Sequence, residues 1–137
     1  MRSTLGKWGD TLKKIFRKAN GQEEVQTPQN MSATFELKYR SLLIGTLTLQ
    51  EGIWEFSYSE DFKEQDKIEP LVNFPKKEKV YSNSYLFPFF MKRIPGLKQP
   101  RVQERIKREK IEGTNEAVLL KTFGKVSITN PFILQAI

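Results

Sequence analysis

At 137 residues the chain has the length of one domain with some additional sequence, and it contains neither cysteine nor histidine. This composition excludes a disulfide framework, a thiolate nucleophile, and the proton transfer and metal binding that depend on imidazole. The net charge of +7 is unevenly distributed, because residues 1–20 and 92–110 are basic whereas residues 51–69 are acidic. Such a charge distribution suits an anionic partner: nucleic acid, an anionic membrane or an acidic protein surface.

Residues 1–20 have the pattern of a basic amphipathic helix, with lysine and arginine opposite an apolar face. That face comprises Leu5, Trp8, Leu12, Ile15 and Phe16. Two glycines weaken the helix, so we expect it to form fully only against another surface. Peripheral contact of residues 3–19 with a membrane, insertion into a partner groove, and packing on the chain's own domain are the alternatives.

Residues 21–33 are polar and lack periodicity, which predicts a flexible linker before a folded domain at 34–137. No apolar run reaches the roughly 18–20 residues that cross a bilayer, and the N-terminus lacks the features of a secretory signal. We therefore expect a cytoplasmic protein.

Alternating apolar and polar residues predict three consecutive strands in the first part of the domain. Phe35, Leu37 and Tyr39 define the inner face of the first strand, and Trp54, Phe56 and Tyr58 that of the third. Between them Leu43, Gly45, Leu47 and Leu49 face inward, and Glu51-Gly52 forms a tight turn. Short connections predict an antiparallel meander. Ser59 should then cap a short helix, and residues 68–74 should form an extended edge segment.

The most aromatic stretch of the chain lies at residues 82–96 and predicts a helix over residues 85–94. Ser84 is the expected cap, Pro88 lies in the first turn, and Pro95-Gly96 ends the helix. Because this helix is apolar on nearly every side, it must fill the core or dock on a partner. Two more helices are expected, one at residues 100–110 after Pro100 and one that is capped by Thr114 or Asn115 and ends near Phe123. A short strand at 126–129 and an apolar tail should follow.

The sequence thus predicts an α+β fold, in which a small antiparallel β-meander packs with three or four short helices behind an amphipathic N-terminal helix. The basic helix at 100–110 offers Arg101, Arg105 and Arg108 as anion contacts, although the simpler interpretation is a solvated surface helix. No aromatic residue interleaves with these basic residues for base stacking, so direct nucleic-acid binding ranks second to protein binding.

Catalysis is not indicated. The chain has no Gly-rich phosphate loop, and its three aspartates lie in the basic N-terminal helix and an acidic surface turn. The pair Glu60 and Glu64 lacks the apolar surroundings on which acid–base catalysts depend. We therefore expect no enzymatic activity, no cofactor and no metal site.

The order of these elements resembles the N-terminal subdomain of HipA-family serine/threonine kinase toxins. The similarity rests on residues 43–47, Phe56-Ser57-Tyr58, the aromatic helix ending at Pro95, and Leu119-Leu120 with Phe123-Gly124. Two departures are the absence of a Glu between Pro95 and Gly96, and residues 125–128 in place of a Gly-Ala step. The kinase core of the family is not present in these residues.

The resemblance implies a non-catalytic subunit of a split toxin–antitoxin system that docks on a separate HipA-like kinase core and restrains it. A DNA-binding antitoxin would be a further partner. Apolar surface at the junction with the core favours association. The candidate anchors are aromatic and aliphatic residues of the aromatic helix and the tail: Phe87, Phe90, Met91, Ile94, Leu97, Phe132 and Ile133. A few of them must instead fill the domain's own core, and the sequence does not distinguish which.

Overall fold

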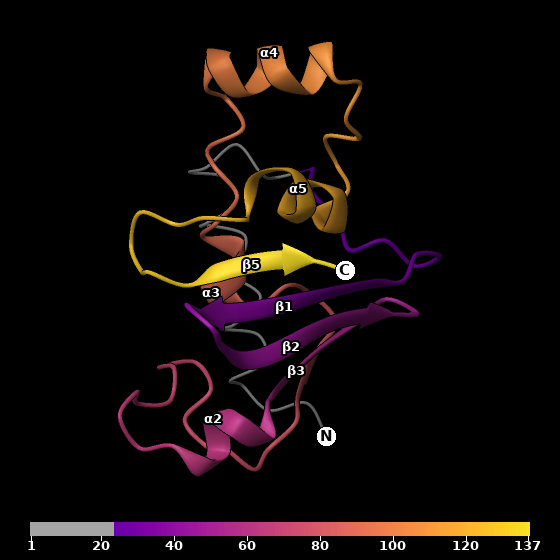
Figure 1. Cartoon of the computed structure of the whole chain (residues 1–137). Helices are drawn as coiled ribbons and strands as arrows, with labels where there is room; N and C mark the ends of the chain where they lie inside the picture. The colour runs from indigo at the N-terminus through magenta and orange to yellow at the C-terminus, as the bar shows by residue number, and fades with distance from the viewer. Residues whose placement is uncertain (1–23) are drawn as a thin grey trace, which may run out of the picture.

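The computed structural model describes residues 24–137, which form one five-stranded antiparallel sheet and four short helices. The strands are β1 (Ala33–Tyr39), β2 (Leu42–Gln50), β3 (Ile53–Tyr58), β4 (Tyr81–Asn83) and β5 (Ile133–Ala136). They lie in the order β4-β3-β2-β1-β5 (Figure 1). The α+β prediction and the meander of β1, β2 and β3 are confirmed.

The connection between β2 and β3 is the tight turn that the sequence predicts. Glu51 and Gly52 have φ angles of 51° and 77°, the left-handed pair that joins twisted strands. Gly45 in β2 is required for a different reason. A Cβ atom there would lie 2.5 Å from the Ser57 carbonyl oxygen, so only glycine allows β3 to approach β2 this closely.

One detail of β2 differs from the strict alternation that we predicted. The pairing with β1 shifts between Leu37 and Lys38, which leaves Ile44 as the extra residue of a β-bulge. Ile44 is therefore fully buried, whereas Leu43, the expected inner residue, is only half-buried. Beyond the bulge, Leu47 and Leu49 point into the core as predicted.

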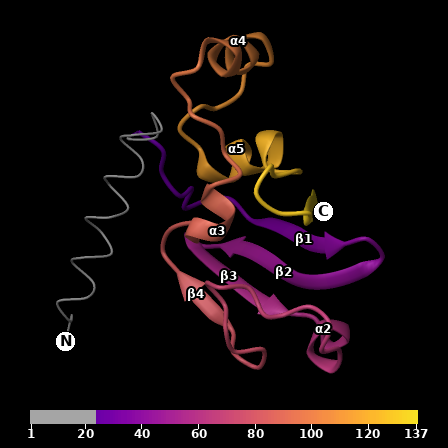
Figure 2. The ribbon, with the colours of Figure 1, turned by 90° about the vertical axis from the view of Figure 1, so that its left-hand side faces the viewer.

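The helices are α2 (Glu60–Glu64), α3 (Pro88–Met91), α4 (Pro100–Arg108) and α5 (Glu116–Phe123). Three begin as the sequence indicates: the Ser59 side chain caps α2, Pro100 occupies the first turn of α4, and of the two candidate caps for α5 it is Asn115 that caps it. Figure 1 shows α2 and α4 at opposite ends of the molecule, and Figure 2 shows the same arrangement from the side.

The aromatic helix is much shorter than predicted. It covers four residues, and the residue before it is Phe87, which supplies no side-chain cap, so the expected cap at Ser84 is wrong. Residues 92–94 continue as turns, because Arg93 and Ile94 each donate a backbone hydrogen bond to the third preceding carbonyl. Pro88 does occupy the first turn.

Both edges of the sheet differ from the prediction. The fifth strand is Ile133–Ala136 in the expected apolar tail, not residues 126–129, and it pairs with β1 from Phe35 to Lys38. The opposite edge is Tyr81–Asn83, not residues 68–74, which form turns. Residues 68–74 instead contribute Leu71 and Phe74 to the core.

The described part of the predicted linker is not a flexible tether. Val25 is buried, the Gln26 amide donates to the Thr114 carbonyl at 2.8 Å, and the Glu116 amide donates to the Gln26 carbonyl at 3.0 Å. This segment has no periodicity because it adds a single bridge beside α5 rather than a strand. Val25 and Gln26 therefore pack on the domain.

Candidate interaction surfaces

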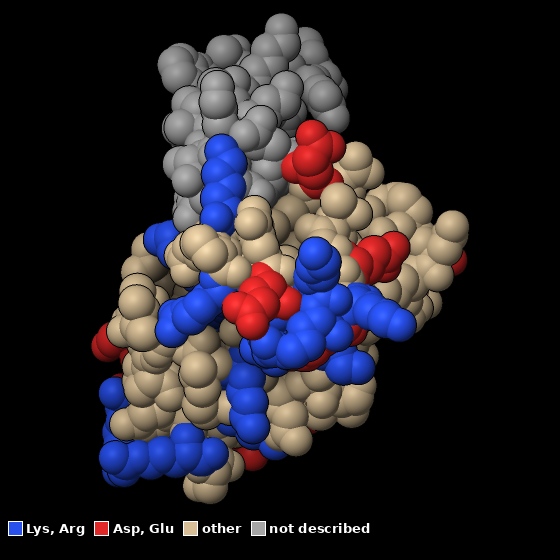
Figure 3. Space-filling view, turned by 90° about the horizontal axis from the view of Figure 1, so that it is seen from above, with Lys and Arg blue, Asp and Glu red and all other residues tan. Residues whose placement is uncertain are grey.

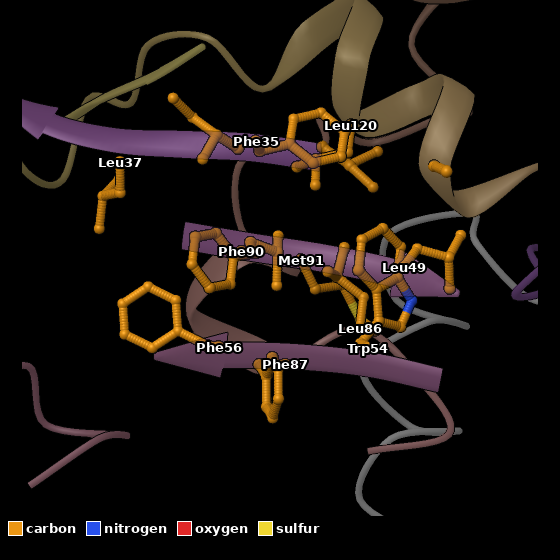
Figure 4. Close-up of a cluster of buried hydrophobic side chains, with 14 of the residues drawn as sticks. Phe35, Leu37, Leu49, Trp54, Phe56, Leu86, Phe87, Phe90, Met91 and Leu120 are labelled. Carbon is orange, nitrogen blue, oxygen red and sulfur yellow. The ribbon is translucent and has the colours of Figure 1, made fainter. Parts of the chain in front are cut away.

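The aromatic segment that we predicted as a docking surface lies in the domain's own core. Figure 4 shows Phe87, Phe90 and Met91 against the inner face of the sheet, close to Phe56. The Phe90 ring lies 5.6 Å from that of Phe56 between centroids. Five of the seven expected anchors are buried: Phe87, Phe90, Met91, Ile94 and Leu97. We expected a few of the candidates to fill the core, but these five all do, because the sheet required covering on one face and this segment covers it. As exposed anchors these five are therefore wrong.

The other two expected anchors are half-buried. Phe132 packs against Tyr39 with ring centroids 6.0 Å apart and against Phe89 at 6.4 Å, so it lies at the edge of the core. Ile133 begins β5. The five apolar residues predicted on the N-terminal helix, Leu5, Trp8, Leu12, Ile15 and Phe16, lie outside the described residues.

The three arginines predicted as anion contacts do lie together. Arg101, Arg105 and Arg108 recur along α4 at helical spacing and line one groove of about 430 Å³. Only Val102 of this helix is buried, so α4 is the largely solvated helix that its charge pattern predicted. We call this the α4 groove.

A second groove, of about 470 Å³, lies between two loops that are distant in the sequence. It is lined by residues 70–73, Phe89 and Lys92 together with Thr129 and Asn130. Each loop exposes an aliphatic side chain: Val72 lines the groove and is 94% exposed, and Ile128, which precedes the lining residue Thr129 in the chain, is fully exposed. We call this the loop groove. Exposed aliphatic residues clustered around a hollow are typical of a protein-binding surface.

Tyr58 holds the loop that contains residues 70–73 in place through two hydrogen bonds. Its hydroxyl donates to the Phe74 carbonyl at 2.5 Å and accepts from the Leu71 amide at 2.9 Å. Burial raises the pKa of Tyr58 to about 12, an effect that the Leu71 hydrogen bond partly offsets. The residues flanking Val72 are therefore held in place while Val72 itself points to solvent.

Arg93 fixes the second loop. Its guanidinium is buried and donates to the carbonyls of Gly124, Lys125 and Phe132 and to the Asn130 side chain, at 2.8–3.2 Å. No carboxylate among the described residues pairs with it, and its Nε atom has no hydrogen-bond partner there. Burial lowers the pKa of Arg93 to about 10, so the group stays charged at neutral pH. The guanidinium holds residues 124–132, including the turn that carries Ile128.

Glu116 connects three distant parts of the chain. One of its carboxyl oxygens accepts hydrogen bonds from the Thr27 hydroxyl at 2.6 Å, the Trp54 indole N–H at 2.8 Å and the Leu86 amide at 3.0 Å. The side chain is fully buried at the start of α5. A buried acid that receives several donors is a structural arrangement, and each donor depends on it.

These residues carry only weak signals in the sequence. Val72, Val126 and Ile128 are aliphatic residues inside segments rich in turn-forming residues, where polar side chains are the usual choice. Glu116 and Arg93 carry no local signal, because their roles come from partners 30 or more residues away.

Residues 24–137 contain no group of acidic side chains placed to hold a metal ion. Within the same part of the chain, no helix has the length and apolarity needed to cross a membrane.

The geometry of residues 24–137 defines a small α+β domain with a closed core and with the α4 groove and the loop groove on its surface. The chain belongs to the HipA N-terminal domain family, whose sequence model matches residues 35–128. The match extends from β1 to the loop of Ile128, which confirms the resemblance in the sequence. A comparison with curated proteins returned no match.

Proposed function

We propose that this protein is a non-catalytic subunit that binds a HipA-type kinase core on a separate chain and restrains it, as part of a bacterial toxin–antitoxin system. The proposal rests on one combined observation: the chain belongs to the HipA N-terminal domain family, and its domain has the loop groove on its surface. A domain of this family that closes its own core and still exposes aliphatic side chains around a hollow has a surface suited to a protein partner.

The loop groove is the surface that we assign to the kinase core. Val72 and Ile128 project from loops fixed by Tyr58 and Arg93, so little conformational entropy is lost when a partner covers them. Lys92 lies on the groove wall and offers a charge to an acidic residue of the partner. The proposal places the complex in the cytoplasm, where a kinase has access to ATP.

Co-expression tests the proposal. A HipA-type kinase core should be encoded beside this gene, and the tagged chain should co-purify with it and lower its autophosphorylation. Replacing Val72 and Ile128 by Ser should weaken binding at least about tenfold, because both would be central apolar anchors. The matched control is Val80→Ser, which truncates another exposed valine away from the groove and should leave binding unchanged.

Two results would count against the proposal. A kinase core that neither binds the wild-type chain nor changes its activity would remove the regulatory function. Equal binding by the wild type and the Val72/Ile128 variant would show that the interface lies elsewhere on the domain. The isolated chain should also bind no nucleotide, which calorimetric titration with ATP measures.

A further inference from the structure

The α4 groove combines a basic rim with an apolar floor. Its walls carry the three arginines of α4 together with Glu104 and Gln99. Its floor is formed by Pro95, Val102 and Phe123. A volume of about 430 Å³ falls within the roughly 300–1,000 Å³ of sites that enclose small ligands or parts of larger ones.

The rim arginines are available to an incoming anion. Arg101 forms no ion pair with any residue between 24 and 137. Arg105 pairs with Glu109 at 2.8 Å and Arg108 with Glu104 at 3.4 Å; the side chains of the second pair are largely solvent-exposed, and those of the first are partly exposed. Exposed pairs of this kind contribute little stability, so a partner carboxylate can replace either one. Arginine pairs with carboxylates through two parallel hydrogen bonds.

The floor distinguishes this surface from a simple basic patch. The Arg105 guanidinium lies 5.0 Å from the centre of the Phe123 ring and covers part of it. Phe123 is therefore not free to stack on a nucleic-acid base, yet it offers apolar surface to a side chain that enters beside Arg105. A phosphodiester backbone would leave the floor unused.

The position of the groove makes an intramolecular occupant from the acidic part of the chain impossible. Residues 51–69 carry that acidic charge, and α2 within them lies at the end of the molecule opposite α4 (Figure 1). Viewed from the end that carries α4, lysine and arginine side chains gather on the surface with a few acidic ones among them (Figure 3). Residues 98–110 contribute six basic and two acidic side chains.

We propose that the α4 groove binds an acidic peptide segment of a protein partner, with an apolar side chain of the segment on the Phe123 floor and flanking carboxylates on Arg101 and Arg108. A peptide satisfies both the rim and the floor. Glu104 and Glu109 reduce the positive electrostatic potential that would attract a long polyanion. At short range, a carboxylate of the partner can replace either glutamate in its ion pair with arginine. This surface is separate from the loop groove and does not depend on the proposed kinase partner.

Fluorescence anisotropy with the full chain tests the proposal. The probe is a labelled peptide EELFEE, compared with QQLFQQ, EEEEEE and a short DNA duplex at physiological salt. EELFEE should bind in the micromolar range, and both control peptides should bind at least about tenfold more weakly because each lacks one of the two contacts. Binding of EELFEE should weaken as salt is raised.

Charge-matched variants locate the site. Arg101→Gln with Arg108→Gln should weaken EELFEE binding about tenfold or more, whereas Lys67→Gln with Lys76→Gln removes the same charge from exposed positions elsewhere and should have no effect. The Val72/Ile128 variant should also bind the peptide normally, which separates this proposal from the kinase interface. Circular dichroism confirms that each variant is folded.

Four outcomes would overturn the inference. In the first, the wild type does not bind EELFEE, and in the second, the Arg101/Arg108 variant binds it as tightly as the wild type does. In the third, the DNA duplex binds more tightly than the peptide. In the fourth, the chain self-associates as its concentration rises, and the same arginine substitutions abolish this self-association. The third would assign the surface to nucleic acid, and the fourth would assign it to the acidic end of a second copy.

Discussion

Single buried polar side chains hold this domain together at points where the apolar core alone would not define the chain path. Glu116 receives donors from the segment before β1, from β3 and from the start of the aromatic segment. Arg93 performs the equivalent role for the loop after α5. In both cases several hydrogen bonds to one side chain join segments that no strand or helix pairing connects.

Replacing Glu116 by Ala should lower the free energy of unfolding by about 3 kcal/mol or more. The Trp54 indole and the Leu86 amide would stay buried without an acceptor, and each unpaired group costs about 1–3 kcal/mol. Glu116→Gln should cost less, because an amide oxygen accepts the same hydrogen bonds. Urea denaturation measures the difference. The control Glu64→Ala removes an exposed glutamate and should change stability by less than about 0.5 kcal/mol. An alanine variant as stable as the wild type would contradict this role.

At the scale of elements, Tyr58 holds the middle of the loop between α2 and β4, at Leu71 and Phe74. Tyr58→Phe keeps the stacking on Phe62, whose ring lies 4.6 Å away, but leaves the Leu71 amide and the Phe74 carbonyl without their partner. We expect a loss of about 1–3 kcal/mol and faster amide hydrogen exchange at Leu71. Normal exchange at Leu71 in the variant would show that the loop is fixed by packing alone.

The raised pKa of Tyr58 gives this loss a defined pH dependence. Folding favours the neutral phenol, so the contribution of Tyr58 is complete below its unfolded pKa of 10 and is lost as pH rises to about 12. The difference in unfolding free energy between the wild type and Tyr58→Phe should therefore shrink across this range. Comparing the two proteins at each pH cancels the titration of the lysines. A constant difference would contradict the assigned pKa.

Elements with local signals were predictable from the sequence, and those that depend on distant partners were not. Glu51-Gly52, Ser59, Pro100 and Asn115 each fix a turn or a helix start through their own backbone or side chain. The strand at Ile133–Ala136 exists because β1, almost 100 residues earlier, leaves an edge to pair with. No periodicity over four residues reveals such a partner.

The same distinction applies to the candidate sites. Arg101, Arg105 and Arg108 could be placed on one surface because helical spacing and charge both act locally. The aromatic anchors could not be assigned, since a segment that is apolar on all sides has no face that marks it as inner or outer. The loop groove requires two loops to meet, and only tertiary structure brings Val72 close to Asn130.

At the scale of the whole molecule, the position of the aromatic segment separates two kinds of substitution. Phe90 and Ile94 are buried and belong to the core that also contains Phe56 and Leu120. Val72 and Ile128 are exposed and contribute almost nothing to that core. Core residues determine stability, and exposed apolar residues beside a groove determine binding.

We therefore expect Phe90→Ala combined with Ile94→Ala to unfold the domain. Truncating a buried Phe costs about 3–5 kcal/mol and a buried Ile about 2–5 kcal/mol, against a total stability of about 5–15 kcal/mol for a typical domain. Val72→Ser combined with Ile128→Ser should change the melting temperature little, because both side chains already contact water. Thermal denaturation followed by circular dichroism measures both. If the Phe90/Ile94 variant melted like the wild type, the aromatic segment would not be part of the core. Its residues would then become candidates for a partner interface once more.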